Sequence, residues 1–230
     1  MLADLLNALS TRLQRKFQEI PKVSVTLYEK LASKVLERMY DIVVEEIDET
    51  KRVVVDVGCG TGKLMAKTVL QGKSEFMLGL DVSKAMINIA KKNLRRNGVY
   101  DKCDIILGDA HHLPFRDRAL NLILSTGTLH HLRKPLTFFG ECLRVLKEDC
   151  EAWIYELSYD ISYHEVRETA KIMNKQSLLL KIASTLHGIP RRELLKEYIK
   201  PFKSKHREYY VNLLTQGLIS KIILVKKTLS

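Results

Sequence analysis

The stretch from Lys51 to Gly62 constrains this chain most, because it joins a buried strand to a glycine-rich turn. Residues 53–57 (VVVDV) are apolar except for Asp56, a run typical of a strand buried on both faces of a parallel sheet. Glycines then occupy every second position from 58 to 62, and Leu64, Met65 and Val69 follow at helical spacing. A strand, a glycine turn and a helix predict a ligand site at the carboxyl edge of an open α/β sheet.

The glycine turn fits a cationic ligand better than a phosphate. A Walker-type loop requires G-x-x-x-x-G-K-[ST], but Leu64 follows Lys63 and the spacing is one residue short. A dinucleotide fingerprint requires G-x-G-x-x-G, whereas this chain has G-x-G-x-G, although Asp81 stands at about the distance of a ribose-binding carboxylate. Asp56 would repel a pyrophosphate and attract a cation, such as the ammonium and sulfonium of S-adenosylmethionine. The alternative is that Asp56 only fixes the loop.

The chain resembles the class I S-adenosylmethionine-dependent methyltransferases, in particular the large subgroup that acts mostly on small molecules. Residues 53–62 are similar to the first motif of that family at every defining position. The resemblance continues through Asp81, residues 108–110, residues 125–132 and residues 144–156, roughly the middle half of the chain. It implies an α/β fold with a Rossmann-like seven-stranded sheet in the order 3-2-1-4-5-7-6, the last strand antiparallel and helices on both faces.

The resemblance also implies which residues would hold the methionine half of the cofactor. Backbone carbonyls near Ser125 and Thr126 would receive its ammonium. Asp56 would face the same positive charge. The backbone of the first motif would approach the ligand closely through Gly58, Cys59, Gly60, Thr61 and Gly62.

The adenosine half would lie against the ends of the next two strands. Asp81 would accept hydrogen bonds from both ribose hydroxyls, Val82 would lie against the adenine, and Met86 would contact the adenosine or only pack on the sheet. Asp109 would accept from the exocyclic amine, and the N–H of Ala110 would reach a ring nitrogen. S-adenosyl-L-methionine is therefore the expected cofactor and S-adenosyl-L-homocysteine the expected product.

The segment after the fourth strand favours a small-molecule methyl acceptor over nucleic acid. Enzymes that methylate base amines usually carry [N/D]-P-P-[Y/F] there, whereas this chain has STGTLHHL at residues 125–132. His130 could act as a general base or only shape the wall of the cofactor site. Glu156 and Tyr159 are the other catalytic candidates. Tyr28, or alternatively Tyr40, could reach the substrate from an N-terminal helix, as Tyr159 and His130 could from the core.

Composition is ordinary for a single α/β domain of 230 residues with an appendage. No apolar run has the length of a membrane span, and charges interrupt any signal-peptide core in the first twenty residues. The four cysteines show no metal spacing, so no metal site is predicted and a reduced, cytoplasmic location fits best. The amphipathic first helix would pack on its own domain or on the partner subunit of a homodimer; a membrane-surface or targeting role is the alternative.

The sequence divides into four predicted regions. N-terminal helices that cover the cofactor site (1–50) precede the cofactor-binding core (51–159), a helical lid or substrate segment (160–205) and a C-terminal β-hairpin (206–230). Within them we expect a fifth strand over residues 152–157 after a turn at residues 148–151. We also expect one helical stretch over residues 161–187, and hairpin strands over residues 209–214 and 218–225.

Two alternative functions remain at this stage. The net charge is +11, and residues 160–230 carry 14 Lys and Arg against 6 Asp and Glu, so an RNA methyltransferase is one alternative. The absence of an obvious base motivates the other, a non-catalytic S-adenosylmethionine-binding subunit. The residues that would grip RNA phosphates are Arg191, Arg192, Lys196, Lys200, Lys203, Lys205 and Arg207.

Overall fold

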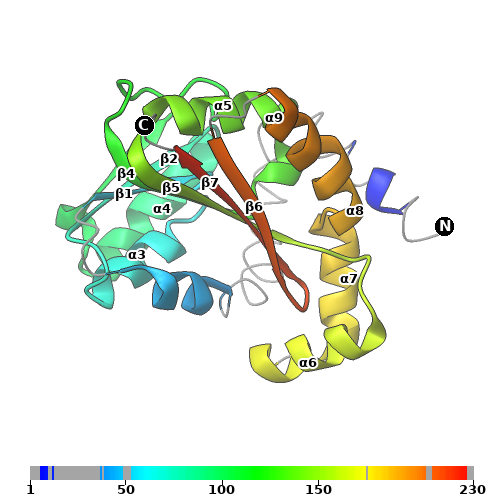
Figure 1. Cartoon of the computed structure of the whole chain (residues 1–230). Helices are drawn as coiled ribbons and strands as arrows, with labels where there is room; N and C mark the ends of the chain where they lie inside the picture. Colours follow the sequence, from blue (N-terminus) through cyan, green and yellow to red (C-terminus); the bar gives the residue numbers. More distant parts are fainter. Residues whose placement is uncertain are drawn as a thin grey trace.

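A seven-stranded sheet in the order β3-β2-β1-β4-β5-β7-β6 forms the centre of the computed structural model (Figure 1). The structure describes residues 6–9, 12, 37, 39–48, 53–174, 176–205 and 209–226. The predicted strand order is confirmed: β1 to β5 are parallel to their neighbours, and β7 alone runs antiparallel to both of its neighbours. The strands are β1 (Val53–Val57), β2 (Phe76–Asp81), β3 (Cys103–Leu107), β4 (Leu120–Thr126), β5 (Leu146–Leu157), β6 (Tyr209–Gln216) and β7 (Ile219–Lys226).

Helices cover both faces of the sheet and bury one apolar cluster on each. One face packs against α3 (Lys63–Leu70), α4 (Lys84–Arg96) and helical residues 39–46, with side chains from α6 (Tyr163–Met173) and α7 (Ser177–His187). The other face packs against α5 (Pro135–Val145), the π-helix η3 (Leu194–Ile199) and α9 (Lys200–Lys205). The short elements are η1 (Tyr100–Lys102), η2 (Leu129–His131) and α8 (Arg191–Glu193). None of the helices in the described residues is long and apolar enough to cross a membrane.

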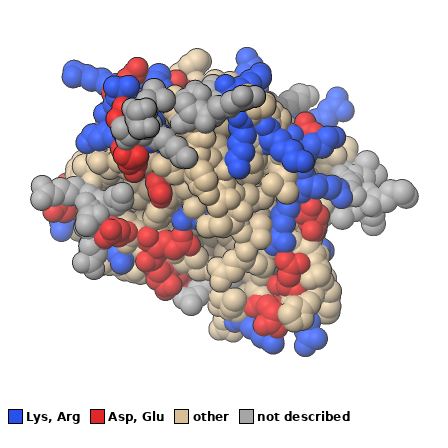
Figure 2. All heavy atoms as spheres, in the orientation of Figure 1, with Lys and Arg blue, Asp and Glu red and all other residues tan. Residues whose placement is uncertain are grey.

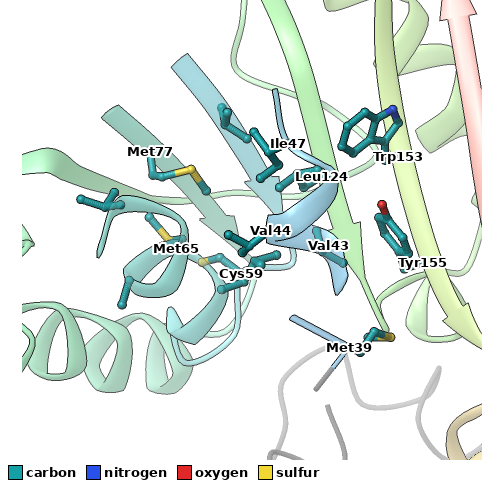
Figure 3. Close-up of a cluster of buried hydrophobic side chains, with 14 of the residues drawn as sticks. Met39, Val43, Val44, Ile47, Cys59, Met65, Met77, Leu124, Trp153 and Tyr155 are labelled. Carbon is teal, nitrogen blue, oxygen red and sulfur yellow. The ribbon is translucent and has the colours of Figure 1, made fainter. Parts of the chain in front are cut away.

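Residues 39–47 complete the helical layer that contains α3 and α4. They lie between α3 and the strands β4 and β5 (Figure 3). Val43 and Val44 are fully buried, and Ile47 is almost so. Figure 3 shows them between Met65 and Met77 on one side and the strand residues Leu124, Trp153 and Tyr155 on the other. The apolar spacing of this segment in the sequence therefore corresponds to a buried helix face.

The connection into β5 differs from the expectation. We predicted a turn at residues 148–151 and a strand from residue 152, but β5 begins at Leu146, which pairs with Leu120. The register then shifts between Leu120 and Leu122, and Asp149 has φ 56°. The chain thus stays extended over residues 148–151 and absorbs the extra length in an irregularity of the strand pairing.

Two further boundaries were wrong. Residues 161–187 form two helices, since α6 ends at Asn174 in the left-handed conformation (φ 49°) and α7 starts at Ser177. The first hairpin strand is also longer than predicted, because β6 runs to Gln216, and the second starts one residue later, so the turn is confined to residues 217–218. Gly217 allows this tight turn with φ 55°.

Arg144 joins α5 to the loop before β4, and its removal should destabilise the fold. Its guanidinium donates to the Glu141 carboxylate (2.8 Å, twice), to Asp117 (2.7 Å) and to the carbonyl oxygens of Leu113 and Phe115 (2.9 Å each). Arg144→Met removes all five of these donated hydrogen bonds and leaves Glu141 with only the Leu113 N–H as a donor among the described residues. We expect it to lower the free energy of unfolding in urea by about 2–3 kcal/mol.

Arg116→Met is the matched control for this measurement. Arg116 is exposed and makes no hydrogen bond within the described part of the chain. Its loss should change the free energy of unfolding by less than about 0.5 kcal/mol. Equal effects of the two substitutions would show that the Arg144 network contributes no stability.

Candidate functional site

A pocket opens at the carboxyl edge of β1 to β4, where the sequence predicts a ligand site. The β1–α3 turn, the ends of β2 and β3 and the loop after β4 supply most of its lining, and Tyr40 adds a side chain from the N-terminal helix. Most of the predicted cofactor residues line it: Gly58, Cys59, Gly60, Thr61, Asp81, Val82, Met86, Asp109, Ala110 and Thr126.

The glycine turn is tied to the neighbouring strands. The Gly58 N–H donates to the Leu80 carbonyl at 2.7 Å, and the Gly60 N–H donates to Asp81 Oδ2 at 2.8 Å. Gly58 has φ 76°, and a Cβ there would lie 2.1 Å from Thr128 Oγ1 in the loop after β4. A larger residue at position 58 would therefore push two walls of the pocket apart.

The Asp81 carboxylate is fixed at the end of β2 by two backbone donors. Oδ2 accepts from Gly60, and Oδ1 accepts from the Ser83 N–H at 2.8 Å. Burial raises the pKa of Asp81, and the backbone hydrogen bonds partly offset this rise. Each carboxylate oxygen has a second lone pair, so the group can still accept from a pair of ligand hydroxyls.

Asp56 lies deeper than the sequence suggests. It is 1% exposed and does not belong to the pocket lining, and its Oδ1 has no hydrogen-bond partner among the described residues. Burial, and secondarily the charge of Asp81, raises its pKa from 3.8 to about 7. Because the folded protein holds this proton more tightly than the unfolded chain, stability falls as pH rises from about 4 to about 7. A cation bound beside the carboxylate would offset that loss.

Two other predicted cofactor residues also lie outside the lining, as do the catalytic candidates His130, Glu156 and Tyr159. Ser125 is fully buried one position after the partner of Asp56 in β4, and its Oγ likewise has no hydrogen-bond partner among the described residues. A Cβ on Gly62 would lie 3.1 Å from Ala90 Cβ, so this glycine lets α3 approach α4. Two unpartnered polar atoms, a glycine turn and a fixed carboxylate fit a ligand that carries an ammonium and a diol, as S-adenosylmethionine does.

The predicted catalytic residues His130 and Glu156 form a buried pair behind the pocket wall. His130 Nδ1 lies 2.9 Å from Glu156 Oε2, and Oε1 accepts from the Leu129 N–H at 2.6 Å. Burial raises the pKa of Glu156 to about 8, although backbone N–H groups and the charge of His187 lower it in part. The His187 ring of α7 lies 6.0 Å from the His130 ring, and burial lowers the pKa of His187 to about 4. A buried carboxyl and a facing imidazole can share one proton.

The remaining predictions divide between the core and the N-terminal part. Tyr159 is 7% exposed, and its carbonyl accepts from Lys181 Nζ of α7 at 2.7 Å. Tyr28 lies outside the described residues, whereas Tyr40 lines the pocket. Sequence analysis missed His131, which lines the pocket and packs on His130 with ring centroids 4.1 Å apart.

Asp109 is held by a residue that sequence analysis also missed. Its Oδ1 accepts from the His111 N–H at 2.9 Å and lies 2.6 Å from His111 Nδ1. Partial burial raises the pKa of Asp109, but the two hydrogen bonds from His111 and the nearby charges of His111 and His112 together outweigh it, so the pKa falls below its usual value. Asp109 therefore remains a carboxylate, as an acceptor for a ligand amine requires. Only the short spacing of two residues after Asp109 could have pointed to His111.

Comparisons with known proteins agree with this geometry. Residues 55–154 match the family model of a methyltransferase domain. The chain is 28% identical over 164 residues to malonyl-[acyl-carrier protein] O-methyltransferase of Geobacter sulfurreducens, covering 71% of this chain and 55% of that protein. It is 33% identical over 107 residues to demethylmenaquinone methyltransferase of Lactobacillus johnsonii, covering 45% and 43%. The chain thus spans about half the length of these relatives.

The fold is also similar to that of a solved methyltransferase structure. A Methanococcus maripaludis protein described as an S-adenosyl-L-methionine-dependent methyltransferase superposes with TM-score 0.70 at 20% identity, covering 94% of each chain. Its likeness shows the shared architecture of the sheet and its helices. Together with the matched domain and the motifs on β1 to β4, it leads to one assignment. Over residues 55–154 the chain therefore contains a methyltransferase domain of the class I S-adenosylmethionine-dependent family, whose cofactor is S-adenosyl-L-methionine.

Proposed function

We propose that this protein transfers the methyl group of S-adenosyl-L-methionine to a small-molecule acceptor by in-line displacement. The observation that carries the proposal is the convergence of the glycine turn, Asp81 and Asp109 on one pocket, with the unpartnered Asp56 carboxylate behind it. Asp56 and the strand ends around Ser125 would hold the ammonium, Asp81 the ribose, and Asp109 with Ala110 the adenine. The cofactor supplies a methyl group that its sulfonium makes electrophilic.

Alignment is the main task of the protein in such a transfer. Holding two reactants in near-attack geometry can lower a barrier by about 7–11 kcal/mol. The glycine turn is anchored by hydrogen bonds to Leu80 and Asp81, and the loop after β4 is anchored by the Gly127 N–H to the Tyr155 carbonyl at 2.8 Å. These two anchored walls would orient one reactant and exclude water from it.

The His130–Glu156 pair would accept a proton if the acceptor must lose one. A proton taken up by His130 would be stabilised by Glu156, which faces Nδ1 at 2.9 Å in a site with almost no solvent contact. Such base catalysis contributes roughly 10²–10⁴-fold. Tyr159, at the end of the same strand as Glu156, would border the acceptor.

The relatives support the small-molecule class without identifying the acceptor. Two of them are named for a malonyl-acyl-carrier-protein and a demethylmenaquinone substrate, and each of those proteins extends well beyond the matched part. We extend to this chain only the chemical class, a small organic group that carries an ionisable oxygen or an acidic carbon. Such a nucleophile must lose a proton, which the buried imidazole–carboxylate pair would accept.

A methyl-transfer screen tests the proposal. The full chain is incubated with S-adenosylmethionine labelled in the methyl group and with fractionated small metabolites and RNA from the source cell. We expect label in a small-molecule fraction. Cofactor binding with no labelled product in any fraction would instead support a non-catalytic subunit.

The basic surface of the protein is the feature relevant to the alternative that the acceptor is RNA. Figure 2 shows Lys and Arg side chains gathered over α8 and α9, and Lys196, Lys200, Lys203 and Lys205 are exposed there. Arg191, however, donates to Glu165 at 2.8 Å and to the Gly217 carbonyl, so it ties α8 to α6 and to the hairpin. Arg207 lies outside the described residues. A salt titration of tRNA and rRNA binding tests this alternative, because phosphate contacts make affinity fall steeply with salt.

A further inference from the structure

His111 connects Asp109 to the start of α5. Its Nδ1 lies 2.6 Å from Asp109 Oδ1, and its Nε2 accepts the Lys134 N–H at 3.2 Å. Because a backbone N–H only donates, Nε2 carries no proton, so Nδ1 must carry it and donate to Asp109. The hydrogen-bond network thus assigns His111 as a neutral imidazole of defined tautomer, clamped between a carboxylate and a helix N-cap.

The two oxygens of Asp109 have different surroundings. Oδ1 accepts both the backbone N–H and the ring N–H of His111. Oδ2 receives no hydrogen bond from the described residues, and the Asp109 side chain is 42% exposed and lines the pocket. An exposed aspartate would otherwise sample several rotamers. With Oδ1 bound twice, Oδ2 is left in a fixed place for a ligand donor.

We propose that His111 is a positioning residue, which fixes the orientation of Asp109 and so makes the pocket select a ligand base with an exocyclic amine. The inference rests on the proposed cofactor site and adds the residue that determines its base specificity. If the base carried a carbonyl in place of the amine, its carbonyl oxygen would face the Asp109 carboxylate. Two acceptors would then lie opposite each other, and Asp109 could not rotate to avoid this. Without His111, Asp109 could rotate into solvent and tolerate either base.

The test compares two ligands by calorimetry: S-adenosylhomocysteine and its deaminated analogue S-inosylhomocysteine, in which a carbonyl replaces the amine. We expect the unmodified protein to prefer the amine by about 10- to 100-fold, the range for a hydrogen bond to a charged group. His111→Phe should cut this preference by at least roughly fivefold. His111→Asn, which keeps a donor near the Nδ1 position, should retain most of it. Asp109→Asn gives the reference for lost discrimination, since an amide can turn a donor toward a carbonyl.

His112→Phe is the matched control. His112 is the next residue along the chain, is exposed, and its side chain makes no hydrogen bond within the described residues. It should leave the preference unchanged. An unchanged preference in His111→Phe would overturn the inference, and so would an equal loss of affinity for both ligands, which indicates a purely structural role. No heat with S-adenosylhomocysteine in the unmodified protein would instead overturn the proposed function.

Discussion

Asp56→Asn is expected to weaken the binding of S-adenosylhomocysteine by roughly 100-fold, the effect of losing one close charge pair. The ligand carries an ammonium, and the unpartnered Oδ1 of Asp56 is the buried anionic atom at the edge where that ammonium would lie. Calorimetry at pH 7.5 measures the change. Thermal unfolding of the unliganded variant should show no loss of stability, because the substitution removes a buried carboxylate whose charged form is disfavoured.

The same carboxylate predicts a pH dependence of binding. The pKa of Asp56 is about 7 without ligand. Below pH 7 the Asp56 carboxyl must therefore lose its proton before it can pair with a bound cation. Affinity should therefore rise by up to about tenfold per pH unit between pH 5.5 and pH 7. Asp56→Asn should flatten this rise, whereas Asp104→Asn, at an exposed position of β3, should preserve it. A rise that persists in Asp56→Asn would assign the titration to another group.

His130→Ala and Glu156→Gln are expected to lower kcat by about 10²–10⁴-fold and to leave the affinity for S-adenosylhomocysteine nearly unchanged. The two side chains face each other at 2.9 Å and are both buried, so the proposed base role requires both. Kinetics with the acceptor found in the labelling screen measure the effect.

A double variant separates a catalytic pair from two independent contributions. His130→Ala with Glu156→Gln should be no slower than the worse single variant, because residues that act as a unit are not additive. Full kcat in either single variant would leave the pair with only a structural role, namely holding η2 against β5 through Leu129.

Much of the fold could be predicted because its signals are local. The apolar run before Gly58 and the acidic residue that ends β2 are short patterns with one physical solution. The helix after β2 likewise starts at a local signal, because Ser83 caps α4 by accepting from the Met86 N–H at 3.3 Å. The β5 start and the break at Asn174 were not predicted, because they depend on pairing register and on one left-handed residue.

The sequence predicted which charged residues belong to the site, but not how deeply each of them is buried. Sequence analysis expected the Asp56 carboxylate to face the ligand directly, while the structure buries it outside the pocket lining. It also gave His130 and Glu156 as alternative catalytic candidates, although their side chains lie within hydrogen-bond distance of each other. Residues 26 positions apart on different elements meet only through the parallel pairing of β4 with β5, which no local pattern reveals. The tie between Asp109 and Lys134 through His111 likewise joins the loop after β3 to the start of α5, which are far apart in the sequence.

Titration of the full chain with S-adenosylhomocysteine and, separately, with NADH tests the central claim most directly. A turn preceded by a buried carboxylate should bind the ligand that carries an ammonium and reject the one that carries a pyrophosphate. We therefore expect clear saturable heat with S-adenosylhomocysteine and none with NADH. Saturable heat with NADH alone would contradict the account.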